Sequence, residues 1–143
     1  KGITMTKEEM FEVFGDFDPK AYEAEVEERW AGPALEQSKR RTKTYGKDQW
    51  EEAMAEGESI TVDLAELLRA GNAPEEEKAM DLAERHRLHI DRWFYECSHE
   101  MHAGLGSMYV ADPRFTGYYE KYAPGLAEFI KSAIHANGER HEA

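Results

Sequence analysis

Three side chains able to ligate a metal or act on a substrate lie close together in the chain. Cys97, the single cysteine, is followed by His99 and His102, and His86 and His89 precede it. Cysteine and histidine are zinc ligands, and a thiolate beside a histidine base is a nucleophile. The segment therefore has the residue types for a metal site or for cysteine catalysis.

The spacing of these residues matches neither chemistry. None of the intervals is that of a zinc finger, and His99 and His102 are one residue too close for the HExxH pattern of metalloproteases. On a helix Cys97 and His99 would point in different directions, which leaves His102 as the better partner for the thiol. We therefore predict no catalytic residues, no metal and no cofactor. A metalloprotein or enzyme that uses these side chains stays the alternative.

The two glycines that follow, Gly104 and Gly106, do not form a phosphate loop, because they continue a helical pattern rather than follow a strand. Glycines inside a helix admit a neighbouring backbone or a ligand. Met101, Leu105 and Met108 line one side of this helix. Ordinary core packing is the simpler interpretation of that side. Pocket lining is the alternative, since methionine suits adaptable sites.

The elements that would position these side chains are all expected to be helices. Apolar residues recur at intervals of three and four, and no alternation of period two persists beyond a few residues. Threonine or aspartate caps precede several of the runs, at Thr6, Asp18 and Asp112. The expected helices, about seven, cover 6–15, 18–31, 33–45, 47–70, 74–94 with a continuation from Ser98, a stretch from 112, and 124–138. The sequence therefore predicts an all-α fold.

Length and charge limit the possible functions. A chain of 143 residues is expected to form one domain. Its net charge of −12 argues against nucleic-acid and anionic-membrane surfaces, which need clustered lysine and arginine. No apolar run is long enough to span a membrane and no signal peptide is recognisable, so we expect a cytoplasmic protein.

The first 46 residues differ from the rest of the chain. They are rich in charges and poor in aliphatic residues, so they supply little apolar surface of their own. Their aromatic side chains are large for so polar a stretch: Phe11, Phe14, Phe17, Tyr22, Trp30 and Tyr45. Such a segment either packs permanently on the remainder of the chain or orders against a ligand or a partner helix. From the residues alone we predict an acidic, all-α binding domain.

A family resemblance makes this prediction more specific. The residues that carry it run through almost the whole chain: Phe11 to Pro19, Tyr22 to Trp30, Ala83 to His86, Glu100 to His102, Leu105-Gly106, Met108 to Val110, Asp112, Arg114-Phe115, Pro124 to Ala127 and Ala133-Ile134. In these stretches the chain resembles the TipA-type antibiotic-recognition domain, the C-terminal effector module of certain MerR-family transcription activators.

The resemblance implies a globin-like helical bundle without haem. It implies a single effector domain over 1–143, with 1–46 as a flexible lid over a core of 47–143, that binds cyclic thiopeptide antibiotics such as thiostrepton. It further implies that the full-length protein is a homodimer whose DNA-binding part is absent here. The ligand-binding residues expected on this basis are Phe11, Phe14, Phe17, Tyr22, Trp30, Trp93, Cys97, Met101, Gly104 and Met108.

The chain departs from the family pattern at one position. The resemblance implies covalent capture, in which a cysteine thiolate adds to a dehydroalanine of the antibiotic. The reacting cysteine of the family aligns with Gly104, whereas Cys97 matches a second cysteine. Non-covalent binding is therefore the simpler expectation, and substitution by Cys97 is the alternative.

Overall fold

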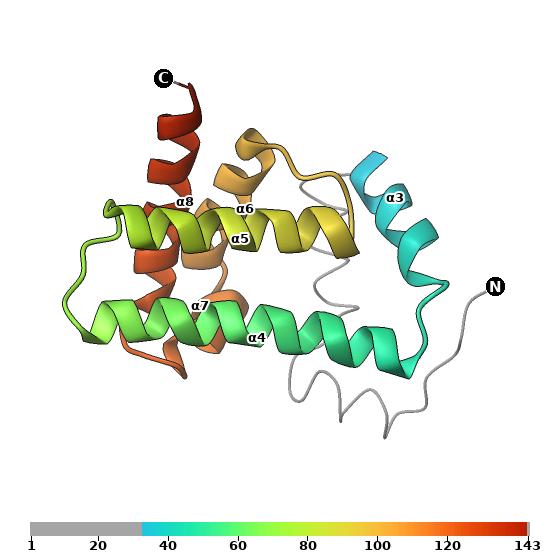
Figure 1. Ribbon diagram of the computed structural model, residues 1–143, viewed down its shortest axis with the longest axis horizontal. Helices are drawn as coiled ribbons and strands as arrows, with labels where there is room; N and C mark the ends of the chain where they lie inside the picture. Colours follow the sequence, from blue (N-terminus) through green and yellow to red (C-terminus); the bar gives the residue numbers. More distant parts are fainter. Residues whose placement is uncertain (1–32, 143) are drawn as a thin grey trace. The chain divides into compact units, whose positions relative to one another are not determined.

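The computed structural model describes residues 33–142, which form six helices and no strand (Figure 1). The helices are α3 (Pro33–Thr42), α4 (Lys47–Arg69), α5 (Glu77–Trp93), α6 (His99–Ala111), α7 (Pro113–Glu120) and α8 (Leu126–Glu142). The all-α prediction is thus confirmed over this range. The helices expected over 6–15 and 18–31 lie outside the described residues. Within the described range, none of the helices is both long and apolar enough to cross a membrane.

The end of α4 shows how a local signal fixes a helix boundary. The helix expected over 47–70 stops beside Gly71, whose backbone has a φ of +86°. Its N–H donates to the Leu68 carbonyl, and the N–H of Asn72 donates to the Leu67 carbonyl, each at 3.0 Å. This pair of bonds is a Schellman motif, in which glycine adopts the left-handed conformation without steric cost.

Two helices begin later than their prolines indicated. Pro74 was expected to open α5, but the Glu76 carboxylate accepts from the Asn72 amide at 2.8 Å and from the Ala73 N–H at 2.9 Å. These bonds hold a turn, and the helix starts after it, at Glu77.

Pro124 was expected to open α8, but the next residue, Gly125, has a φ of +87° that a helix does not allow. The Glu120 carboxylate accepts from the N–H groups of Gly125 and Ala127, at 2.8 and 3.2 Å. Both bonds satisfy donors around the start of α8, which begins at Leu126.

The prediction that Gly138 ends the last helix was wrong, because α8 continues to Glu142. Gly138 is buried, and a Cβ atom there would lie 4.0 Å from the Cβ of His99. This is an ordinary van der Waals distance, and Gly138 does not have the positive φ found at Gly71, so nothing in its backbone stops the helix.

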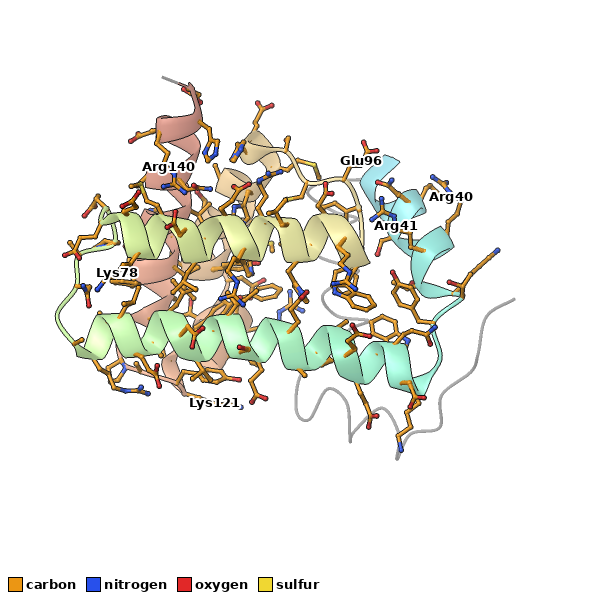
Figure 2. The ribbon with its side chains drawn as sticks, viewed as in Figure 1. Arg40, Arg41, Lys78, Glu96, Lys121 and Arg140 are labelled. Atoms are coloured by element: carbon orange, nitrogen blue, oxygen red, sulfur yellow. The ribbon has the colours of Figure 1, made fainter. Side chains whose placement is uncertain are left out.

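The described residues group into two compact units, the first made of 33–56 and 89–96 and the second of 57–88 and 97–142. In the first unit α3 is attached to the C-terminal end of α5. Arg41 donates to the Asp91 carbonyl, Tyr45 Oη donates to the Trp93 carbonyl at 2.6 Å, and Gln37 accepts from the Glu96 N–H at 2.8 Å. Figure 2 shows Arg41 directed at α5, with Arg40 pointing away from it.

The second unit contains an aliphatic core built from α4, α6 and α8. Its fully buried side chains include Ile60, Leu64, Leu105, Met108, Leu126 and Ile134. α6 packs against both α7 and α8. At Gly106 the helices α6 and α8 come so close that a Cβ atom would lie 3.3 Å from Ile134 Cδ1 and 3.4 Å from Lys131 Cα. Close helix packing, one of the two interpretations of this glycine, is confirmed.

Candidate functional site

The segment that carries Cys97 is a short loop followed by a well-capped helix. Ser98 is the N-cap of α6, and its side chain accepts from the Met101 N–H at 3.1 Å. A serine in this position satisfies one of the free N–H groups of the first turn. Cys97 therefore precedes the helix, and its thiol is buried, with 1% of the residue exposed.

A partly buried ion pair fixes the backbone of this loop. The Arg87 guanidinium donates to the Cys97 carbonyl at 2.7 Å and holds the Glu84 carboxylate through two bonds, at 3.0 and 2.5 Å. Burial opposes ionisation of Glu84, but hydrogen bonds from Arg87 and Asn137 outweigh it and lower the pKa of the carboxyl to about 2. Glu84 is thus an anion at any physiological pH, and α5 positions the loop before α6.

Four of the predicted ligand-binding residues lie in this segment. Met101, Gly104 and Met108 are separated by three and four residues, the spacing of a single face of α6, whereas Cys97 lies in the loop before the helix. Met108 is 1% exposed and belongs to the core, as the simpler interpretation had it. Met101 and Gly104 are half-buried, so they form the accessible part of this face.

Trp93 is the fifth predicted ligand-binding residue within the described range, and it lies in an aromatic cluster of the first unit. Its indole N–H donates to Glu56 at 2.9 Å, and its ring meets the Tyr45 ring edge-on, with centroids 5.6 Å apart. The Arg92 guanidinium lies 4.8 Å above the ring centroid. Trp50 contacts both Tyr45 and Phe94.

Glu56 also bonds to His89 at 2.6 Å. Burial is the largest influence on this imidazole, and it lowers the pKa of His89. The remaining predicted ligand-binding residues, Phe11, Phe14, Phe17, Tyr22 and Trp30, lie outside the described residues.

The histidines near Cys97 have partners other than the thiol. His86 Nδ1 and His102 Nε2 are 2.8 Å apart, and the His86 ring also meets Tyr109 edge-on. His102 is 1% exposed, and its Nδ1 has no hydrogen-bond partner. Burial, together with the positive charges around it, lowers the pKa of His102 to about 2. His102 is therefore a neutral core residue, and the alternative of a base for Cys97 has no geometric support.

The alternative metal site of Cys97, His99 and His102 is not formed either. Within residues 33–142 the one group of potential ligands whose donor atoms lie within 4.8 Å of one another is Glu84, His99 and His141. These residues come from three different helices, so no spacing along the chain could have indicated them. Reasoning from the sequence likewise missed Arg87 as the anchor of the Cys97 loop. One weak sequence feature could have pointed to the ligand cluster and to the role of Arg87: the polar residues Glu84 and Arg87 interrupt an otherwise apolar helix face.

The comparisons with known proteins agree with this architecture. The model of the TipAS antibiotic-recognition domain family matches residues 22–137. The chain is 48% identical, over 98% of its length, to the HTH-type transcriptional activator TipA of Streptomyces coelicolor, of which it covers 56%. It is 31% identical, over 93% of its length, to the HTH-type transcriptional activator mta of Bacillus subtilis, of which it covers 52%. The chain thus spans about half the length of these relatives.

Two solved structures are similar to the chain. One, described as TipAS from Streptomyces lividans in complex with nosiheptide within a thiopeptide antibiotic multidrug resistance system, matches with a TM-score of 0.88 and 48% identity, over 99% of this chain and all of that one. The other, the antibiotic binding domain of a TipA-class multidrug resistance transcriptional regulator, matches with a TM-score of 0.60 and 42% identity, over 66% of this chain and all of that one. The chain belongs to the TipAS antibiotic-recognition domain family.

Proposed function

We propose that the chain is the antibiotic-binding effector domain of a transcription activator and that it recognises thiopeptides of the nosiheptide and thiostrepton kind. The observation that carries this is the 48% identity and TM-score of 0.88 to a domain described in complex with nosiheptide. The relatives are named as transcription regulators, which supports a role in binding rather than in catalysis. On the same grounds we propose a cytoplasmic location, a homodimeric full-length protein and no DNA contact by this domain.

The accessible side of α6 is the proposed contact surface in the second unit. Met101 and Gly104 lie half-buried on it, and the Arg87–Glu84 pair holds the loop that leads into it. A glycine leaves room for a bulky heterocycle, and a methionine adapts to its outline. Trp93 and the five aromatic residues from Phe11 to Trp30 are proposed as further contacts, and residues 1–46 as the lid that closes over the ligand.

Binding is proposed to be non-covalent. The one thiol of the chain is 1% exposed, whereas addition to a dehydroalanine requires an accessible thiolate. After incubation with nosiheptide, the intact mass of the protein should equal that of the protein alone, and Cys97→Ser should bind as the unmodified chain does. A mass increase of one antibiotic that disappears in Cys97→Ser would contradict the non-covalent mode while leaving recognition intact.

Recognition itself is tested by calorimetric titration with nosiheptide. Met101→Ala should weaken binding about tenfold, because truncating one apolar contact removes roughly 1.4 kcal/mol. The matched control is Leu88→Ala, which truncates a side chain exposed to 48% on α5 and should leave affinity unchanged. Amide exchange in the same samples should show protection of residues 1–46 by the ligand. Absence of binding would refute the proposal, and binding without that protection would refute the lid.

A further inference from the structure

Three potential metal ligands from distant parts of the second unit converge on one another. Glu84 lies on α5, His99 is the first residue of α6, and His141 lies in the last turn of α8. One donor atom of each lies within 4.8 Å of the other two. Arg140, labelled in Figure 2, reaches from α8 to Asp81 on α5 at 3.0 Å and so ties these two helices together beside the cluster.

His99 offers the cluster a donor atom that no other described group uses. Nδ1 of His99 is buried, has no hydrogen-bond partner and lies 3.9 Å from a Glu84 oxygen.

A main-chain carbonyl holds the ring of His141, as is common for metal-binding histidines. Its Nδ1 lies 2.8 Å from the Asn137 carbonyl, to which it donates, and this leaves the lone pair on Nε2. Donation of the other ring N–H to a carbonyl is the usual second-shell arrangement around ligating histidines. Asn137 also donates to Glu84 at 2.9 Å, so one residue orients two of the three ligands.

The packing brings the three donor atoms almost to metal-binding distance. The rings of His99 and His141 are stacked, with centroids 4.3 Å apart. A tetrahedral zinc ion with ligands at about 2 Å needs donor atoms roughly 3.3 Å from one another. The donor atoms lie within 4.8 Å of one another, and His141 is exposed near the end of α8, where a small shift of the last turn can close the remaining gap.

The positive charges beside the cluster have carboxylate partners. Arg140 pairs with Asp81, and Arg87 shares the Glu84 carboxylate with the site, so a bound metal would compete with the Arg87 guanidinium for that carboxylate. The whole chain carries a net charge of −12, which favours the approach of cations.

We propose that Glu84, His99 and His141 form a binding site for a divalent transition-metal ion, with Zn²⁺ as the best match and water completing the coordination. Two imidazoles and one carboxylate are a ligand set of zinc rather than of magnesium or calcium, which take oxygen ligands. The site is separate from the predicted antibiotic contacts on α6 and independent of the proposed function. Bound metal would link the start of α6 to α5 and α8.

The test uses the full chain without a histidine tag, stripped of metal by a chelator and titrated with Zn²⁺ by calorimetry. One equivalent should bind per chain, and Co²⁺ in its place should give the visible absorption of a tetrahedral ion. His141→Gln, a change at an exposed residue, should weaken Zn²⁺ binding at least about tenfold. His135→Gln is the matched control on the same helix, because His135 contacts Ser107 and the Ala103 carbonyl instead of the cluster.

The control should retain the affinity of the unmodified chain, and far-ultraviolet circular dichroism should show that both variants keep their helices. The proposal is overturned if the unmodified chain binds less than one equivalent. It is also overturned if the two histidine variants bind zinc equally well.

Discussion

Acid should destabilise this domain through its buried histidine pair, and the size of the effect follows from His102. Its ordinary pKa of 6.5 applies to the unfolded chain, whereas burial lowers the pKa to about 2 in the folded one. The groups that surround the ring are His86, Arg87, His99 and His135, none of which offers a negative charge. The folded state therefore cannot take up the proton that the unfolded state accepts.

The sign and magnitude follow from proton linkage. Below pH 6.5 the unfolded chain binds one proton more at this site than the folded chain does, so the free energy of unfolding falls as the pH falls. Between pH 7.5 and pH 5.0 protonation of a group with the ordinary histidine pKa stabilises the unfolded chain by about 2 kcal/mol, and the folded chain gains almost nothing. This loss continues down to the folded pKa of about 2.

The assay is urea denaturation at both pH values, followed by circular dichroism at 222 nm. His102→Gln keeps a polar side chain but removes the proton site. The drop in unfolding free energy between pH 7.5 and pH 5.0 should therefore be about 2 kcal/mol smaller in this variant than in the unmodified chain. His141→Gln, which removes an exposed ring and leaves the buried pair in place, is the control. If His102→Gln loses as much stability on acidification as the unmodified chain, this reasoning is wrong.

Three further predictions concern local geometry and are read from the same denaturation experiment at pH 7.5. Gly106→Leu should lower the free energy of unfolding by about 2 kcal/mol, because even a Cβ atom at this position would lie 3.3 Å from Ile134 on α8. An unchanged denaturation midpoint would show that α6 and α8 can separate freely. Gly71→Ala should lower the free energy of unfolding by about 1 kcal/mol, because the φ of +86° disfavours any Cβ atom. The control Gly117→Ala, in open space on α7, should raise it by about 0.5 kcal/mol. Ser98→Ala should cost about 1 kcal/mol through loss of the α6 cap, and Ser98→Asp should restore it.

Local signals in the sequence predicted the helices well. Asp112 caps α7 by accepting from the Arg114 N–H at 3.0 Å, and Gly71 ends α4 as its position indicated. Both effects act within one turn of the chain, so the residues involved are adjacent in the sequence. Gly138 was misjudged because a glycine ends a helix only where its backbone turns to positive φ, and Gly138 keeps a helical conformation that lets α8 continue.

The functional site was less predictable than the fold. The spacing of Met101, Gly104 and Met108 places them on one face of α6, but burial separates the core residue from the accessible ones, and no interval along the chain encodes burial. The cluster of Glu84, His99 and His141 assembles only when three helices pack. The antibiotic itself is implied by family membership, not by any motif that composition or periodicity could identify.

The attachment of α3 limits where a lid can hinge. Gln37, Arg41 and Tyr45 are bonded to main-chain groups between Asp91 and Glu96, where the last turn of α5 would otherwise leave carbonyls bare. Moving α3 away from α5 would break these three hydrogen bonds together. The proposed lid must therefore either pivot before Gln37 or move together with the end of α5 and the loop before Cys97.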